Sequence, residues 1–199
     1  MTVRRHDPGR RNRIIDACLD LITEVGVAGV SHRKVAALAD VPLGSMTYHF
    51  AGMDELLREA FGRFSRSVSD GFEQRMSEAT DLASARAAVI EIITRDVFGS
   101  QRDLVLTHEL YTLAAREPAF RELTNAWMAR SRAALERHFD PVTARMLDAL
   151  IEGLTIHRAL DTEPPHRDTM TEAVRRITAG PGDVIGRTSG DRQPELPIA

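Results

Sequence analysis

Residues 31–50, SHRKVAALADVPLGSMTYHF, decide the interpretation of this chain. Ser31 is a favourable N-cap residue for a short helix over residues 32–39. A two-residue turn follows, and Pro42 opens a second short helix that runs to about residue 48, because proline costs least at the first helical position. Two short helices joined by a tight turn, with a longer helix ahead of them, predict a helix-turn-helix.

The residue types in this stretch favour contact with duplex DNA. The second short helix would enter the major groove with its N-terminal half facing base edges, while the first would lie across the backbone. A helix N-terminus with basic side chains attracts phosphates, and a glycine allows the backbone to approach the duplex closely. The residues predicted to lie at the DNA are His32, Arg33, Lys34, Leu43, Gly44, Ser45, Thr47, Tyr48 and His49.

Apolar side chains of the same stretch are spaced to face the helix that precedes them. That first helix is expected from about Pro8 to Val25, with Asp7 as its N-cap and Gly26 at its end. Its apolar stripe is Ile14, Cys18, Leu21, Ile22 and Val25. The partners expected to pack against it are Val35, Leu38, Ala39, Val41, Met46 and Phe50.

The rest of the chain reads as serial helices, with no sustained period-2 alternation that would indicate strands. A long helix starts near Asp54, and the breaks beyond it fall at Gly99 and at prolines. The later helices are expected near residues 82–99, 102–116, 118–138, 142–160 and 167–179. The fold class is therefore all-α with about nine helices. The last twenty residues, 180–199, carry four glycines and three prolines and predict a disordered tail.

Composition and isolated motifs exclude several classes of function. The formal net charge is −3, yet residues 1–50 hold seven basic and five acidic side chains, so the charge distribution allows a local phosphate-binding patch. Cys18 is the only cysteine, which excludes an intramolecular disulfide and a thiolate zinc cage. His108-Glu109 lacks the second histidine of a zinc-protease motif, and no phosphate-binding glycine loop occurs. We expect no enzyme activity, cofactor, metal site or membrane span.

Residues 9–60 resemble the DNA-binding domain of the TetR family. The matching runs are RIIDACLDLITEVGVAGVS, then HRKVAALADVPLGSMTYHF, then DELLREAF, and the later run LDALIEGLTIHRAL at 147–160 resembles the family's dimer-forming helices. The resemblance implies that Arg33 and Lys34 contact backbone or base and that Gly44, Ser45, Tyr48 and His49 lie at the DNA surface. It also implies a dimer that binds a palindrome and releases it when a small molecule enters the C-terminal domain.

Three positions depart from the family pattern. Thr47 stands where a tyrosine is frequent, Leu43 where a polar or basic residue is common, and Met53 where a lysine often touches phosphate. If exposed, Leu43 is suited to contact a thymine methyl group. Fewer phosphate contacts predict a shallower dependence of DNA affinity on salt.

The C-terminal half is expected to supply dimerisation and ligand sensing. A reader of palindromic half-sites needs two-fold symmetry, and two apolar helices per subunit can form a four-helix interface. The interface residues expected are Met146, Leu150, Leu154, His157, Met170, Val174 and Ile177. Aromatic or polar residues on mainly apolar helices are the ligand-binding candidates. They are Arg102, His108, Tyr111, Trp127, Met128 and His157.

The sequence thus predicts a cytoplasmic, dimeric, sequence-specific transcriptional regulator, a repressor whose partners are double-stranded DNA, a second copy and a small-molecule effector. The alternative is a small-molecule-binding or protein-interaction module with weakened DNA binding. Thr47, Met53 and the acidic total charge favour this alternative, whereas the intact HRK and TYHF segments argue against it. We expect a helix-turn-helix domain over residues 1–52, a ligand-binding and dimerisation domain over 53–179, and the tail over 180–199.

Overall fold

The computed structural model describes residues 8–97, 100–163 and 166–179, and within these ranges every regular element is a helix. The all-helical fold class is therefore confirmed. Predictions about the tail at 180–199, the N-cap at Asp7, and the breaks at Gly99 and Pro164-Pro165 lie outside the described residues.

Four elements form the N-terminal part of the chain: α1 (Arg10–Val25), the short 3-10 turn η1 (Val27–Gly29), α2 (His32–Leu38) and α3 (Gly44–His49). Gly26 ends α1 with a φ of 69°, as predicted, because a residue without Cβ adopts this backbone most cheaply. The start of α1 was misplaced by the pattern: Gly9 is the N-cap, and Pro8 precedes the helix. Likewise Pro42 lies just ahead of α3 rather than in its first turn.

The remaining helices match the predicted ones to within a few residues except at one place. They are α4 (Met53–Ser77), α5 (Leu82–Glu91), α6 (Gln101–Arg116), α7 (Pro118–Leu135), α8 (Pro141–Leu160) and α9 (Arg167–Ile177). Between α5 and α6 the chain forms a π-helical turn, η2 (Ile92–Val97), where one continuous α-helix was expected. The Thr94 hydroxyl donates to the Ile90 carbonyl here (2.8 Å). Single π turns inside helices often occur at functional sites.

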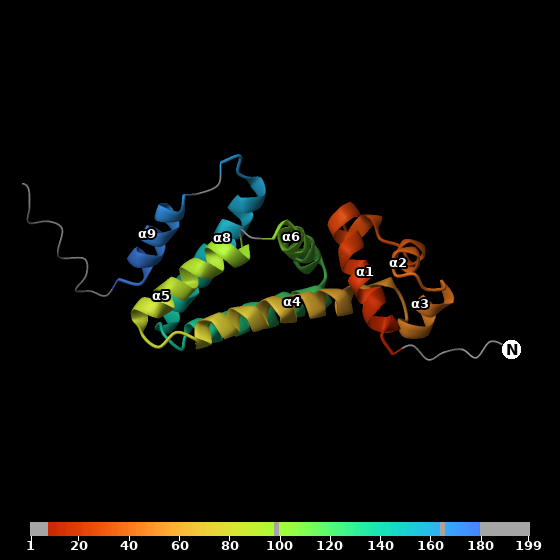
Figure 1. The fold of residues 1–199 in the computed structure, drawn as a ribbon, viewed down its shortest axis with the longest axis horizontal. Coiled ribbons are helices and arrows are strands. Elements are labelled where there is room, and N and C mark those ends of the chain that lie inside the picture. Colours follow the sequence, from red (N-terminus) through yellow and green to blue (C-terminus); the bar gives the residue numbers. More distant parts are fainter. Residues whose placement is uncertain (1–7, 98–99, 164–165, 180–199) are drawn as a thin grey trace, which may run out of the picture.

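Helix α4 connects the two ends of the molecule, as Figure 1 shows. Helices α1, α2 and α3 lie at the end where α4 begins, and α5, α8 and α9 gather at its far end. Helix α7 packs along α4, and α6 contacts both α7 and α1. Helix α6 therefore contacts the N-terminal helices on one side, as the start of α4 also does, and belongs to the C-terminal bundle on the other.

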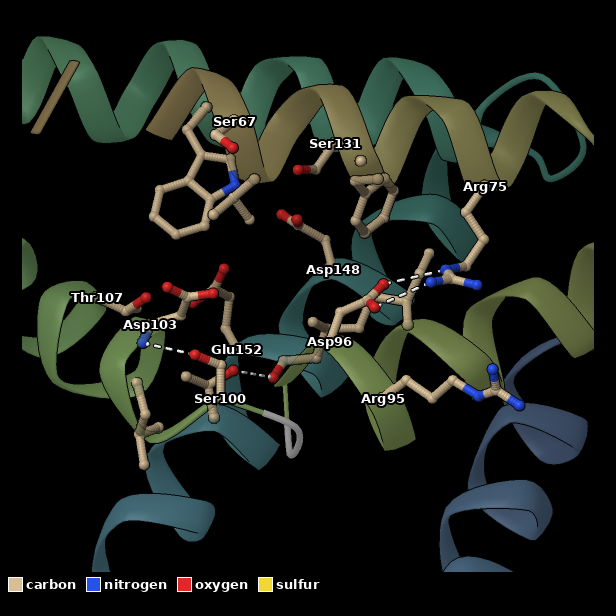
Figure 2. A pocket seen from close by; sticks show the side chains of 18 of the residues that line it. Ser67, Arg75, Arg95, Asp96, Ser100, Asp103, Thr107, Ser131, Asp148 and Glu152 are labelled. Carbon is tan, nitrogen blue, oxygen red and sulfur yellow. Dashed lines mark hydrogen bonds and ion pairs between the residues drawn. The ribbon is translucent and has the colours of Figure 1, made fainter. Parts of the chain in front are cut away.

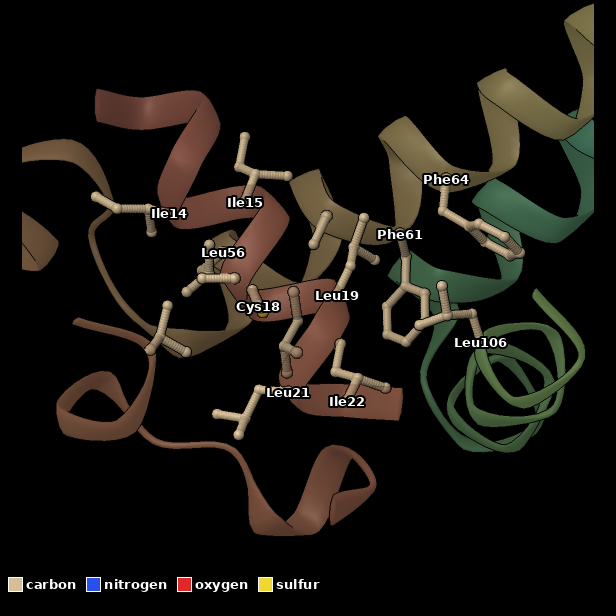
Figure 3. Packing of buried hydrophobic residues seen from close by; sticks show 14 of the residues in the cluster. Ile14, Ile15, Cys18, Leu19, Leu21, Ile22, Leu56, Phe61, Phe64 and Leu106 are labelled. Carbon is tan, nitrogen blue, oxygen red and sulfur yellow. The ribbon is translucent and has the colours of Figure 1, made fainter. Parts of the chain in front are cut away.

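One hydrophobic core joins the N-terminal helices to the C-terminal bundle (Figure 3). Ile14, Cys18 and Ile22 on α1 lie against Leu56 and Phe61 on α4, and residues of α6 and α7 complete the cluster: Leu106, Leu110, Ala114, Phe120 and Trp127. Two of the α1 to α3 residues expected in this core are exposed instead, Val25 and Leu38. The core spans both sides of residue 52, so the division at 52/53 stays a prediction.

A second core fills the far end of the bundle. It is built from α4, α5, η2, α7, α8 and α9, and its largest members are Phe72, Met76, Ile92, Ile93, Leu135, Phe139, Leu147, Ile151, Met170 and Val174. Asp81 caps α5 through the Ser84 amide (2.7 Å), and Asp140 caps α8 through the amides of Val142 and Thr143. These caps define where the helices that carry this core begin.

Cys18 provides a direct test of the first core. The thiol is fully buried, and burial raises its pKa to about 12, so the reactive thiolate is scarce at neutral pH. We expect iodoacetamide at pH 8 to leave the folded protein unmodified and to alkylate one thiol after denaturation, as measured by mass spectrometry. Rapid modification of the native protein would show that α1 does not pack as described.

Candidate nucleic-acid interface and internal cavity

Local contacts that the sequence dictates hold the two short helices. The Ser31 hydroxyl accepts a hydrogen bond from the Lys34 amide (3.3 Å), as predicted for an N-cap. Asp40 has a φ of 51°, a left-handed conformation that aspartate tolerates, and it reverses the chain after α2. The Val41 amide then donates to the Ala36 carbonyl (3.0 Å). Backbone contacts thus set the orientation of α3 relative to α2.

Helix α3 faces the core with one side and solvent with the other. Met46 is fully buried, whereas Leu43 and Tyr48 are 55% and 82% exposed. Gly44 and Thr47 are exposed beside them. Leu43 and Tyr48 are large, largely apolar side chains that are both exposed on one short segment, which indicates a surface that contacts another molecule.

Helix α2 adds two exposed cations to this surface. Arg33 has no hydrogen-bond or ion-pair partner within the described parts of the chain, so its guanidinium is available to a phosphate. The Lys34 ammonium donates to the Gly29 carbonyl (2.8 Å), which holds it at the edge of the same surface. His32 is half-buried at the start of the helix.

Three residues of this region lie differently from their predicted places. Ser45 is only 8% exposed, so its assignment to the DNA surface is wrong. Leu38 is 50% exposed, and the smaller Ala36 takes its place in the core, because the buried face of so short a helix covers adjacent positions. His49 is half-buried and packs edge-on against the Tyr48 ring, with centroids 4.9 Å apart.

A partly open cavity of about 360 Å³ lies between α4, η2, α6, α7 and α8 (Figure 2). Its volume is within the range of about 300–1,000 Å³ typical of small-molecule sites. Apolar and aromatic side chains form much of its wall, and hydroxyl groups from four of the elements interrupt it: Ser67, Ser100, Thr107, Ser131 and Thr155. The arrangement is that of a ligand pocket with a few polar groups that orient its contents.

The structure brings two of the six predicted ligand-binding residues to this cavity, Tyr111 and Trp127. The other four lie outside its wall: Arg102, His108, Met128 and His157. Arg102 instead pairs with Asp20 on α1 (2.9 Å), and His157 is exposed near the end of α8. Helical periodicity identifies the helices that form the cavity but does not tell which side of each helix faces it.

Most of the charged groups in the wall have an ionic partner, either in the wall or just outside it. Arg75 donates two hydrogen bonds to Asp96 (3.0 Å each) at one edge of the cavity (Figure 2). Asp148 forms an ion pair with Arg132 on α7 (3.0 Å). Desolvation by burial nevertheless raises the pKa of Asp148, because the pair lies away from bulk water.

Glu152 differs from the other carboxylates of the wall. It accepts a hydrogen bond from the Tyr111 hydroxyl, and no basic side chain of the described residues lies within 4.0 Å of it. Burial raises the pKa of Glu152, and burial together with the Glu152 charge raises the pKa of Tyr111, which keeps the phenol protonated as a donor. Sequence reasoning missed both Glu152 and Asp148. The available signal was two carboxylates four residues apart within an apolar helix.

Helix α6 links this cavity to the N-terminal helices. Leu104, Thr107 and Tyr111 line the cavity from α6. On the same helix, the Glu109 carboxylate accepts a hydrogen bond from the Val27 amide (3.1 Å), at the turn that joins α1 to α2. A displacement of α6 would therefore change both the cavity wall and the turn between α1 and α2.

Two family models match the chain. Residues 14–60 match the model described as bacterial regulatory proteins of the tetR family, and residues 77–180 match the tetracyclin repressor-like C-terminal domain. The chain belongs to the TetR family. It is a DNA-binding transcriptional regulator and not an enzyme.

Individual relatives agree with this TetR assignment. The solved structure of SCO7518 from Streptomyces coelicolor A3(2) is 60% identical, with a TM-score of 0.81, and the match covers 87% of this chain and all of that one. The multidrug binding protein EbrR, solved in complex with ethidium, is 34% identical over 86% of this chain and 99% of its own, with a TM-score of 0.73. The transcriptional regulator BetI of Cronobacter sakazakii is 24% identical over 87% of this chain and 93% of that protein.

In the described ranges of this TetR-family chain, no helix is both long and apolar enough to cross a bilayer. Across those same ranges, no group of three or more histidine, cysteine, aspartate or glutamate side chains is arranged to hold a metal ion.

The TetR-family chain also carries an apolar stripe on the outer side of α8. Its members recur at alternating intervals of four and three residues, the spacing of a helix-helix seam. We call this the α8 stripe; it consists of Val142, Met146, Ala149, Gly153, Ile156 and Leu160. Its four large members are exposed.

The predicted dimer-interface residues divide between this stripe and the interior. Met146 belongs to the stripe, and His157 is exposed beside it. Met170 and Val174 are buried in the second core, so their assignment to an interface is wrong: α9 turns its apolar side toward α5 and α8 of its own subunit. The remaining three are partly buried against that core: Leu150, Leu154 and Ile177.

Proposed function

We propose that this TetR-family regulator is a dimeric repressor that binds a palindromic operator and leaves it when a small molecule enters the cavity. The observation that carries the proposal is the joint geometry of α3 and α6. Helix α3 presents exposed side chains suited to DNA, and α6 connects the cavity to the turn ahead of α2.

DNA recognition is assigned to the exposed side of the helix-turn-helix. Arg33 and Lys34 would meet phosphates from α2, while Leu43 and Tyr48 would reach base edges or backbone from α3. Gly44, which has no side chain, would allow the backbone to approach the DNA closely, and Thr47 is exposed beside it. Ser45 is left out because it is buried, and the half-buried His32 and His49 act as flanking contacts.

Dimerisation is assigned to the α8 stripe. Each chain supplies one reading helix, and a palindrome has two half-sites, so a second copy is the partner that the DNA geometry requires. The small residues Ala149 and Gly153 at the middle of the stripe would allow two α8 helices to approach closely. The space beside Gly153 is open: apart from its chain neighbours and the backbone of its own helix, a Cβ there would meet nothing within 4 Å.

The effector is assigned to the cavity between α4, η2, α6, α7 and α8. Its volume and mixed lining support a small-molecule ligand. The relative EbrR, described as a multidrug binding protein, is solved with ethidium, proflavin and malachite green. Effector binding would favour a placement of α6 that moves the reading helices out of register with the two half-sites.

Selection from a pool of random duplexes, with sequencing of the retained DNA at several salt concentrations, tests this function. We expect an enriched palindromic motif, which the protein binds about a thousandfold or more tightly than bulk DNA. Retention without any motif would contradict specific recognition and favour a ligand-binding module with weakened DNA binding. An enriched but non-palindromic motif would contradict the dimer.

Glu109 is predicted to hold the α1–α2 joint to α6. Glu109→Ala removes the acceptor of the Val27 amide, and we expect faster hydrogen exchange at that amide and a loss of about 1–3 kcal/mol in the free energy of unfolding. Glu109→Gln retains an acceptor oxygen and should preserve most of the protection. Unchanged exchange at Val27 in the alanine variant would show that this contact does not couple the two parts.

A further inference from the structure

The cavity carries a negative charge that the protein does not neutralise. Four carboxylates and two guanidinium groups belong to its wall. Both arginines are engaged: Arg75 by Asp96, and Arg95 by Glu91 outside the cavity. Of the remaining acids, Asp148 has Arg132 and Asp103 has Arg102 at 3.8 Å, which leaves Glu152 without an ionic partner within the described ranges.

Aromatic rings lie next to this carboxylate. Tyr111, whose hydroxyl donates to Glu152, has its ring centroid 6.0 Å from that of Trp127, and both rings line the cavity. The faces of tyrosine and tryptophan attract cations, most strongly where water is excluded. A flat cation placed here would contact aromatic faces and a carboxylate at once.

We propose that the cavity selects a flat organic cation and that Glu152 is its counter-ion. The inference rests on the proposed function only in taking this cavity as the effector site. Burying a carboxylate without a counter-ion is unfavourable in free energy. An anionic ligand would make the burial more unfavourable, whereas a cationic ligand would compensate the charge. Figure 2 shows Glu152 and Asp148 reaching into the same space below Ser131, where such a ligand would lie.

Protonation of Glu152 competes with the cation. Burial raises the pKa of this carboxyl, so lowering the pH neutralises it sooner than an exposed glutamate. Affinity for a permanent cation should therefore fall as the pH drops through the raised pKa, and binding should release a proton. Three titratable groups act directly on Glu152: Tyr111, Asp148 and His108. The other charged groups of the cavity wall and its edge also contribute to this profile: Arg75, Arg95, Asp96, Asp103 and Arg132.

Ethidium fluorescence with the full chain, without DNA, tests the proposal, because its quaternary nitrogen stays charged at every pH. Wild-type protein should bind ethidium more tightly than the anionic aromatic probe anilinonaphthalene sulfonate. Glu152→Gln should weaken ethidium binding on the order of tenfold to a hundredfold and flatten its pH dependence, while anilinonaphthalene sulfonate binds equally well or better. Glu122→Gln, on the exposed side of α7, is the matched control and should change neither probe.

Equal ethidium affinity in Glu152→Gln and wild type, or tighter binding of the anionic probe by wild type, would overturn the proposal. So would an absence of ethidium binding. The pH dependence of ethidium binding by the wild-type protein provides a test that does not depend on how the variant folds. An ethidium affinity that stays constant as the pH is lowered from neutrality into the acid range would also contradict the role of Glu152. Ethidium binding that fails to release operator DNA would refute the proposed release mechanism and leave this inference standing.

Discussion

Replacing Arg33 or Tyr48 by alanine is expected to weaken operator binding by roughly tenfold to a hundredfold, with little change in stability. Both side chains stand in solvent on the helix-turn-helix, and Tyr48 is 82% exposed. Neither belongs to a core cluster, so their removal leaves no cavity. The loss should therefore be confined to binding, measured by fluorescence anisotropy on the selected operator.

The two variants should differ in how their losses arise. Arg33→Ala removes a phosphate contact, so affinity should fall for every sequence and the slope of log affinity against log salt should shrink by about one. Tyr48→Phe keeps the ring and removes the hydroxyl, so comparison with Tyr48→Ala separates stacking from hydrogen bonding. Arg116→Ala, an exposed arginine at the end of α6, is the matched charge control and should bind normally.

Full operator affinity in both variants would place the DNA on another surface of the protein. Weak binding accompanied by a lower unfolding temperature would assign the two side chains to folding instead. Unaltered salt dependence in Arg33→Ala would mean that the guanidinium reads a base or points to solvent in the complex.

The sequence predicted this region well because its signals are local. Ser31 caps its helix through an amide three residues away, and Gly26 ends α1 by its own backbone preference. The errors at Leu38 and Ser45 have one cause: helices of six or seven residues give too few turns for periodicity to locate the buried side. Which of two adjacent positions faces α1 depends on the packing angle between helices.

The cavity could not be derived in the same way. Its wall joins Ser67 on α4 to Thr155 on α8, and five elements contribute to it. Sequence spacing shows which residues share one side of a helix. It does not show how that helix is rotated about its axis relative to its neighbours, and so does not tell which side faces a cavity. Tyr111 and Trp127 are unusual residue types on these helices and were predicted, whereas Glu152 was not, because acidic residues are common on helix surfaces.

Dimerisation illustrates the same limit. An apolar residue on an amphipathic helix is equally compatible with the interior of its own subunit and with an interface, and sequence alone did not separate the two for Met170 and Val174. Exposure separates them. Val142, Met146, Ile156 and Leu160 are apolar and remain in solvent within a single chain, which supports the proposal that this side of α8 contacts a second copy.

Charge introduced on the α8 stripe is expected to abolish the dimer and, with it, specific DNA binding. In the double variant Met146→Glu with Ile156→Glu, the new glutamates of one copy would lie against those of the second copy across the two-fold axis. These like charges would have to be buried in the interface. We expect a monomer of 22.1 kDa by light scattering and a loss of operator affinity of about a hundredfold or more, because one reading helix cannot hold both half-sites. Helicity should persist, since both positions are exposed in the single chain.

Asn125→Glu on the exposed side of α7 adds the same charge away from the stripe, and this control should remain dimeric and bind normally. A double variant that stays dimeric would locate the interface elsewhere. A monomer that keeps full specific affinity would refute two-fold recognition itself, because a single helix-turn-helix would then suffice. The stripe variant and the Arg33 variant thus fail in distinguishable ways: the first loses its oligomeric state together with its operator, while the second remains a dimer that no longer holds the phosphates.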